Sequence, residues 1–244
     1  MEALKFELFG KVAHFKNPES NIKIELSYEN IPKTVIMGVL GALIGLRGRQ
    51  HFKKLGYIEY WEELRDLKVS IIPGKPKWRK HIDNLNNSTG FGNDGDMQNL
   101  NRQILEGVSW VIYIDKSSIK EKYWTEICDS LISRQSNYSL YLGKTEFKAR
   151  LGKVEIVRLT DVSSDEVEFC DSIVPYRYID DIEKDKVEEH RLSKCDGFVR
   201  SDYYPVGLDK YGLYKLDKFI FTNLYLNIIS GNFYKDKSSV ITFF

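Results

Sequence analysis

Residues 32–48 read PKTVIMGVLGALIGLRG, an apolar segment of helical spacing with glycines inside it at positions 38, 41 and 45. Each of these glycines costs a helix about 1 kcal/mol relative to alanine. At 100° per residue, the three glycines and Ala42 fall on one face, opposite Ile36 and Leu40. A helix that loses stability along one line usually lets something approach that line closely. We expect either another backbone or a ligand there.

Both ends of this segment fit a helix. Thr34, two residues after Pro32, is expected to cap the N-terminus, because its hydroxyl can accept a hydrogen bond from a free backbone N–H. Arg47 and Arg49 follow the C-terminal end, where cations interact favourably with the helix dipole and the last carbonyls.

Composition excludes several classes of protein. The chain has 244 residues and 42% are hydrophobic, which is enough for one large domain or two small ones with a packed core. No apolar run approaches the roughly 20 residues that span a bilayer, and the N-terminus has no secretory pattern. Cys128, Cys170 and Cys195 are far apart and odd in number, so they predict neither disulfides nor a zinc site. We expect a cytoplasmic protein with no metal, no cofactor and no membrane contact.

The net charge of +1 hides an asymmetry along the chain. Residues 161–189 contain eleven Asp and Glu against three Lys and Arg, a local charge of −8, so the rest of the chain sums to +9. This pattern indicates a basic body with one acidic segment. The alternative, that lysines simply cover the surface as they do in most proteins, remains open on charge alone.

The periodicity predicts an α+β protein. Alternating or apolar segments indicate strands and amphipathic segments indicate helices. In chain order we expect a strand at 3–15, the glycine-bearing helix, a strand at 67–72, a polar insertion at about 73–103, a strand at 103–114, a helix at 119–134 and a strand at 152–159. This is the βαββαβ order of a ferredoxin-like, RRM-like core. We therefore predict one domain at 1–160 and a smaller, β-rich C-terminal region at 161–244, which is acidic first and then rich in tyrosine.

The insertion is the clearest candidate for nucleic-acid binding. Its residues 75–81 hold five basic or histidine side chains, no acidic one, and Trp78 among them. Polar insertions of this length inside a compact domain are usually functional or disordered. Interleaved cations and aromatic rings suit single-stranded RNA, whose phosphates need charge and whose bases stack. We expect Trp78 to be exposed for this reason.

Alternative chemistry is possible at a few positions. Lys80 and His81 resemble a base and a cation for RNA cleavage, although both also suit simple phosphate contacts. Gly90–Gly95 resembles a phosphate loop but does not lie between a strand and a helix, so we interpret it as a flexible tip. Asp180 and Asp181 are expected to form a solvated turn. The sequence contains no GxxxxGK[ST], GxSxG or HExxH motif.

Two motifs resemble those of a known family. The first is FGKVAHFK at 9–16 followed by PKTVIMGVLGA at 32–42, and the second is YLGKTEF at 141–147. Together they resemble the CRISPR-associated protein 5 family, over about residues 3–157. That family belongs to the repeat-associated RNA-binding superfamily with ferredoxin-like folds, and the chain looks closest to its subtype I-B group.

The resemblance implies a non-catalytic subunit of a type I Cascade surveillance complex. Such a subunit caps the 5′ handle of the CRISPR RNA beside the backbone subunit and the large subunit, meets target DNA only indirectly, and uses the insertion as a thumb hairpin over the guide. The resemblance, combined with the basic residues and the glycine face, gives the candidate RNA-binding residues. They are Lys11, His14, Lys16, Gly38, Gly41, Gly45, Arg47, Arg49, Lys75, Lys77, Trp78, Arg79, Lys80, His81, Lys144, Lys148 and Arg150.

Two other functions remain open. In the I-C branch of the same family, the protein is itself a metal-independent ribonuclease that processes the repeat with Tyr, Lys and His. Lys80, His81 and either Tyr57 or Tyr60 are the matching candidates here. The other alternative is a protein–protein adaptor that uses the acidic segment and binds no RNA. We expect no catalytic residues and no enzyme activity.

Overall fold

The computed structural model describes residues 1–18, 23–87, 98–187, 197–209 and 213–244. Its helices are α1 (Lys33–Ile44), α2 (Phe52–Leu55), α3 (Glu59–Leu64) and α4 (Glu121–Ser133). Its strands are β1 (Glu2–Ala13), β2 (Ile24–Glu25), β3 (Val69–Pro73), β4 (Arg79–Asn87), β5 (Gln98–Asp115), β6 (Arg150–Arg158), β7 (Thr160–Val162), β8 (Val174–Pro175), β9 (Ile179–Val187), β10 (Val199–Leu208), β11 (Tyr214–Thr222), β12 (Leu224–Ile228), β13 (Phe233–Asp236) and β14 (Ser239–Thr242). The protein is therefore α+β, as the sequence predicts.

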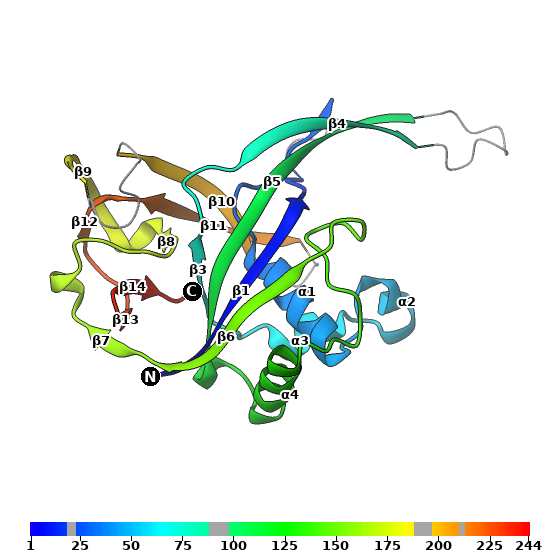
Figure 1. The fold of residues 1–244 in the computed structure, drawn as a ribbon, viewed down its shortest axis with the longest axis horizontal. Coiled ribbons are helices and arrows are strands. Elements are labelled where there is room, and N and C mark those ends of the chain that lie inside the picture. The colour runs from blue at the N-terminus through cyan, green and yellow to red at the C-terminus, as the bar shows by residue number, and fades with distance from the viewer. Residues whose placement is uncertain (19–22, 88–97, 188–196, 210–212) are drawn as a thin grey trace, which may run out of the picture.

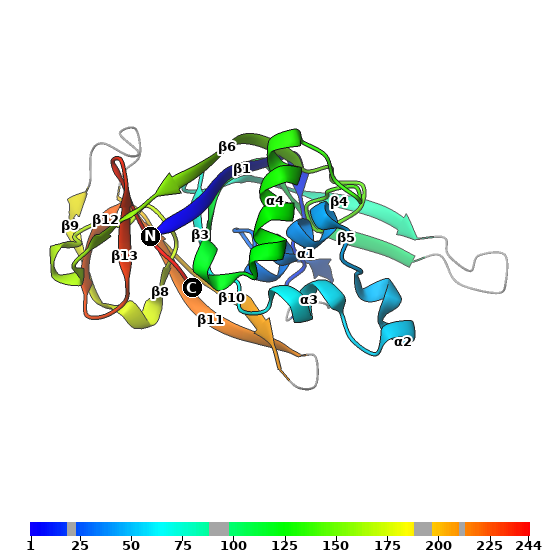
Figure 2. The ribbon, with the colours of Figure 1, turned by 90° about the horizontal axis from the view of Figure 1, so that it is seen from below.

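A central antiparallel sheet organises the molecule. Strand β5 pairs with β1 and β3, and β1 pairs with β6 on its other side, which gives the order β3–β5–β1–β6. Helices α1, α3 and α4 lie together on one face of this sheet (Figures 1 and 2). Leu4, Phe6 and Leu8 alternate along β1 and are fully buried in the core. The period-two pattern of the first strand thus sets which face of the sheet the helices cover.

The first half of β5 extends beyond this sheet. There it pairs with β4 to form a long hairpin, from Arg79 opposite Glu106 to Asn87 opposite Gln98 (Figure 1). The short strand β2 lies parallel to the same part of β5. The predicted insertion therefore projects as a two-stranded arm. The glycine-rich tip that the sequence analysis singled out, Gly90–Gly95, lies outside the described residues.

The C-terminal region forms three small sheets, ordered β10–β11–β8, β12–β9 and β14–β13–β7. Two of them pack on the central sheet and its helices. Ile241 and Phe243 pack with Ala3 and Tyr113 on one side, while Tyr204 belongs to the main core. A further link runs through Asp236 on β13, which accepts hydrogen bonds from Lys5 at 2.6 Å and from the Tyr113 hydroxyl at 2.9 Å.

Helix α1 differs at both ends from the sequence prediction. Pro32, with φ −69° and ψ 149°, occupies the N-cap position without a side-chain hydrogen bond, and Thr34 lies inside the first turn. The expectation that Thr34 caps the helix is therefore wrong. At the other end, Gly45 adopts φ 82° and closes the helix after Ile44. Left-handed backbone favours glycine, so Gly45 ends the helix instead of lying inside it.

Candidate nucleic-acid interface

The glycine face of α1 packs against the short helix α3. A Cβ added at Gly41 would lie 2.5 Å from Tyr60 Cβ, which is closer than real Cβ atoms come. At Gly38 the nearest atom is Tyr60 Cζ, at 3.9 Å. The predicted close approach is therefore present at Gly41. The close neighbour at this position is Tyr60, whose Cβ is attached to the backbone of α3, in keeping with the expectation that another backbone approaches this face.

A cleft of about 540 Å³ opens beside this helix pair. Its walls come from α1, α3, the segment before β6, the end of β10 and the start of β11, and Arg49 is the one charged residue among the described residues that line it. The aromatic lining residues are Tyr60, Trp61, Tyr138, Tyr141 and Tyr214. Of the sequence-predicted site residues, the structure brings Gly38 and Arg49 to this cleft, whereas Gly41 and Gly45 do not line it.

The phenol of Tyr60 lies deep in this wall. Burial raises its pKa, Tyr214 and Tyr141 raise it further, and the guanidinium of Arg49 acts in the opposite direction. These mutual effects place three tyrosine hydroxyls and one cation near one another. Tyr138, Tyr141 and Tyr214 keep 46%, 42% and 43% of their surface exposed.

Trp78 anchors the base of the hairpin instead of lying on its surface. Only 3% of Trp78 is exposed, and its ring meets Trp110 edge-on with centroids 5.5 Å apart. Phe15 packs on the other side of Trp110, at 5.7 Å. The prediction that Trp78 is exposed is therefore wrong, because an aromatic cluster formed by distant strands buries it.

Carboxylates already pair with the hairpin cations that follow Trp78. Glu106, across the ladder, accepts from Arg79 Nε at 3.2 Å and from His81 Nδ1 at 2.6 Å. Lys80 points to the other face of the hairpin and pairs with Glu29. Lys75 and Lys77, on the connection from β3, are exposed and have no ion pair with any described residue. Among the cationic residues of 75–81, these two are the ones that a phosphate can reach without competing with a carboxylate of the described residues.

A charge cluster around the buried Arg102 lies where the hairpin leaves the sheet. Glu25 on β2 accepts from Lys16 at 2.7 Å and from Arg102 at 3.1 Å. Arg102, only 7% exposed, also reaches Glu146 at 3.4 Å. Burial of Glu25 raises its pKa, but the hydrogen bonds from Lys16 and Arg102 outweigh this effect and lower the pKa to about 2. The cluster ties the arm to the turn before β6.

His14 lies beneath this cluster. Burial is the main cause that lowers the pKa of His14 to about 4, and the positive charges of Arg102 and Lys144 act in the same direction. The hydrogen bond to the Gln103 carbonyl acts in the opposite direction and raises the pKa. The ring is therefore neutral near pH 7, with Nδ1–H donating to Gln103 O at 2.9 Å. Because its side chain is fully buried, His14 is a positioning residue at the end of β1 and not an exposed phosphate ligand.

The second sequence motif forms a tight turn against β1. Gly143 has φ 86°, and a Cβ there would lie 1.8 Å from the His14 carbonyl oxygen. Only glycine fits this position. The turn brings Lys144 within electrostatic range of His14 and Glu25. Lys148 and Arg150 follow as exposed residues, and Lys11 is exposed on β1.

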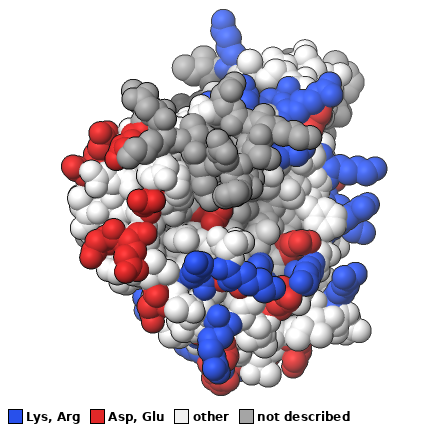
Figure 3. All heavy atoms as spheres, turned by 60° about the vertical axis from the view of Figure 1, so that its left-hand side comes forward, with Lys and Arg blue, Asp and Glu red and all other residues white. Residues whose placement is uncertain are grey.

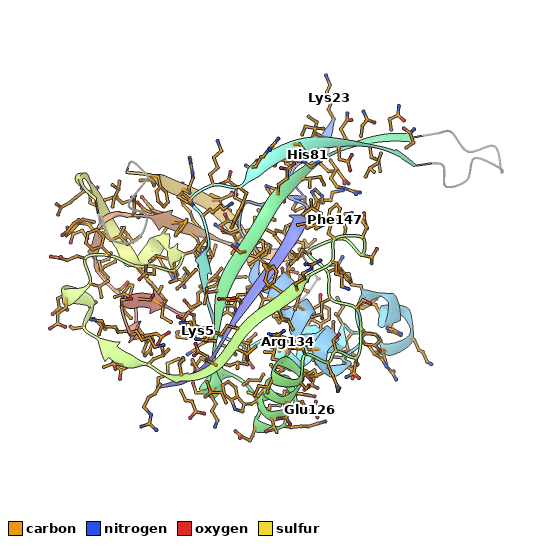
Figure 4. All side chains as sticks on the ribbon, viewed as in Figure 1. Lys5, Lys23, His81, Glu126, Arg134 and Phe147 are labelled. Carbon is orange, nitrogen blue, oxygen red and sulfur yellow. The ribbon has the colours of Figure 1, made fainter. Side chains whose placement is uncertain are left out.

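The structure therefore divides the candidate residues among three places. Lys16, Lys144 and His14 meet at the base of the hairpin, Gly38 and Arg49 meet at the cleft, and Lys75 with Lys77 lie on the connection between β3 and β4. Figure 4 shows His81 on the hairpin and Phe147 in the turn before β6, while Lys5 lies at the opposite end of the sheet. Sequence reasoning missed Glu25, Glu106 and Arg102, whose partners become visible only once the ladder register is known. Arg47 lies beyond α1, its backbone N–H bound to Glu59 at 2.8 Å.

The acidic segment lies away from the hairpin. Strands β7, β8 and β9 carry it, at the opposite end of the molecule from the arm (Figure 1). Acidic side chains gather on the left of the view in Figure 3, and basic side chains lie toward its right and top. Residues 188–189, the last two of the predicted acidic segment, lie outside the described residues.

Two further searches covered the described part of the chain. No group of three or more His, Cys, Asp or Glu side chains there is arranged to hold a metal ion. No helix in the same residues is long and apolar enough to cross a membrane.

Comparisons with known proteins place the fold. No family model and no curated protein sequence matches the chain. A solved structure of a CRISPR protein from Archaeoglobus fulgidus superposes with a TM-score of 0.54 at 13% identity, over 99% of this chain and 98% of that one. A chain of a CRISPR RNA-guided surveillance complex superposes with a TM-score of 0.52 at 13% identity, over 92% of this chain and 91% of that one. The protein therefore has the fold of CRISPR-associated proteins.

Proposed function

We propose that this protein is a non-catalytic, RNA-binding subunit of a type I CRISPR surveillance complex, which holds the 5′ handle of the CRISPR RNA. The observation that carries the proposal is the fold shared with a chain of a CRISPR RNA-guided surveillance complex over nine-tenths of the length. The motifs at 9–16, 32–42 and 141–147 that resemble the CRISPR-associated protein 5 family support the same assignment.

The topology supports it further. We interpret the strand order β3–β5–β1–β6, with α1 and α4 on one face, as a ferredoxin-like core with β4 inserted beside β5. The β4–β5 arm takes the place of the thumb hairpin over the guide. In this proposal the backbone subunit, the large subunit and, indirectly, target DNA are the partners.

A role without catalysis follows from the hairpin geometry. RNA cleavage needs a general base, a general acid and a stabilising cation near one phosphodiester. Lys80 and His81 pair with Glu29 and Glu106 on opposite faces of the ladder, so they do not converge on one phosphate. Tyr60 is partly buried beside α1 and lines the cleft, whereas Lys80 and His81 lie on β4 of the hairpin. These contacts argue against the ribonuclease alternative, and the shared fold argues against an RNA-free adaptor.

The test is the salt dependence of RNA binding by the full chain. Each phosphate contact on a single strand contributes about −0.7 to the slope of log K against log salt, so each lost contact makes the slope less steep by about 0.7. Replacing Lys75, Lys77, Arg79 and Lys80 together with Ala should therefore reduce the steepness of the slope by up to about 3. Unchanged affinity and slope in this fourfold variant would contradict the proposal.

Paired variants sharpen this test. Lys75→Ala with Lys77→Ala removes two cations without carboxylate partners, so it should lower the affinity more than Arg79→Ala with Lys80→Ala. The exposed Lys235, on β13 at the far end, provides the control, and its replacement by Ala should leave the slope unchanged. Co-expression with the neighbouring genes, followed by sequencing of the bound RNA, then identifies the natural ligand.

A further inference from the structure

The cleft between α1, α3, the segment before β6 and β11 has a composition that restricts its ligand. Tyr138, Tyr141 and Tyr214 line it and are each about half exposed, so a ligand in the cleft can reach their side chains. The described lining contains one cation, Arg49, and no carboxylate. A ligand that combines a flat ring with a negative charge complements both features.

The volume of the cleft is also informative. About 540 Å³ is the size of a small-molecule site and admits one nucleotide unit, but it is too small for a folded segment of protein. Hydroxyl groups of Thr34, Ser139 and Thr145 also line it, so donors and acceptors are available to the polar edge of a base.

The cleft is continuous with the charged turn. Gly143 and Thr145 line it, and Lys144, between them, lies within electrostatic range of His14 at the base of the hairpin. A strand of RNA that inserts a base here can therefore continue along Lys144 toward the hairpin. The isolated bridge between Tyr141 and Lys148 fixes the backbone of Tyr141 at the cleft wall.

We propose that this cleft binds one unstacked nucleobase of single-stranded RNA, which stacks on the ring of Tyr141 while Arg49 contacts the adjoining phosphate. The inference rests on the proposed function, because it assumes that the protein binds RNA, and it adds a base pocket to what is otherwise a phosphate-binding surface. Single-stranded RNA is recognised by stacking of splayed bases on aromatic side chains, so tyrosine rings beside an arginine are suited to the task.

An abasic scan tests this directly. A single-stranded RNA of about ten nucleotides, copied from the 5′ segment of the organism's CRISPR RNA, is made with each base removed in turn, and its binding to the full chain is followed by fluorescence anisotropy. Loss of the one base that fills the cleft should weaken binding about 5- to 150-fold, the range for one base–aromatic stack. Loss of a base whose nucleotide is held only by phosphate contacts should have little effect.

Variants of Tyr141 test whether the base found by the abasic scan lies in the cleft. Tyr141→Ala should weaken binding of the intact RNA by a similar factor and remove the effect of the sensitive abasic position, because both changes delete the same contact. Tyr141→Phe keeps the ring and should bind almost normally. Tyr203→Ala is the matched control, since Tyr203 is exposed on β10 and does not line the cleft.

The outcomes separate the two proposals. If RNA binds with a normal salt slope but every abasic position is equivalent, the base pocket is wrong and the proposed function stands. If the full chain binds no RNA, both fail. If Tyr141→Ala leaves RNA binding intact but prevents incorporation into the purified complex, the cleft is a protein docking site, which also overturns the inference.

Discussion

Two glycines on one helix allow the packing of α1 to be measured by matched substitutions. Gly38 and Gly41 both lie inside α1, so replacing either with alanine should gain about 1 kcal/mol of helix propensity. They differ in their neighbours. An alanine Cβ at Gly38 would lie 3.9 Å from Tyr60 Cζ, an ordinary contact, whereas one at Gly41 would lie 2.5 Å from Tyr60 Cβ.

The difference between the two variants therefore isolates the cost of overpacking. Relieving the contact at Gly41 to an ordinary 3.4 Å requires about 0.9 Å of movement. Tyr60 Cβ is attached to the α3 backbone, so the helix itself has to move. Forcing extra atoms into a packed core costs about 1–3 kcal/mol. Gly38→Ala should then stabilise the protein by about 1 kcal/mol, and Gly41→Ala should be about 1–3 kcal/mol less stable than Gly38→Ala.

Urea unfolding followed by circular dichroism measures this difference, with the slope checked for both variants. In a thermal scan, each kcal/mol corresponds to about 2–4 °C for a chain of this size. The reasoning is refuted if Gly41→Ala is as stable as Gly38→Ala, since the close approach of α3 would then have no energetic consequence.

Three further predictions concern charge and chemistry. The unfolding free energy should fall by up to about 3 kcal/mol between pH 6.5 and pH 4 and less so in His14→Gln, because folding lowers the His14 pKa to about 4 and the unfolded chain binds that proton first. Purified protein incubated with its own repeat RNA in the absence of metal should leave it intact, and specific cleavage that disappears in His81→Ala would reverse this assignment. Ultraviolet crosslinks from bound RNA should avoid residues 161–189, and strong crosslinking at Tyr176 or Tyr178 would show that the acidic segment faces the guide.

Helices and strands could be predicted from the sequence where the spacing of apolar residues matches the residues that are buried in the fold. Tyr123, Ile127 and Leu131 repeat at helical spacing and are buried on α4, so that helix is predicted almost residue for residue. Glycine spacing also indicated a close approach to α1. The identity of the neighbour was not accessible, because Tyr60 reaches Gly41 only after the chain has turned through residues 45–58.

The sequence predictions failed where a residue's neighbours come from distant parts of the chain. Trp78 stands among cations and reads as exposed, yet Trp110 on β5 supplies a buried partner 32 positions along the chain. The cleft was invisible for the same reason, since Gly38, Tyr60, Tyr141 and Tyr214 come from four separate segments. The turn at Gly143 belongs to the motif at 141–147 that the sequence analysis quoted, but the close approach of Gly143 to His14 becomes visible only in the structure.

Ion pairs within the protein reduce the number of cations at residues 75–81 that are available to bind phosphate. The sequence places five cationic or histidine residues at 75–81, but Glu29 and Glu106 offset three of them in the folded protein. Phosphates that approach Arg79 or Lys80 have to compete with carboxylates already in contact, which reduces the net gain. Lys75 and Lys77 carry no such cost. The acidic strands β7 to β9 lie at the far end of the molecule and repel a polyanion from that end. In the proposed function, this charge distribution favours a path for single-stranded RNA along the connection before the hairpin and the Lys144 turn, toward the proposed base-binding cleft.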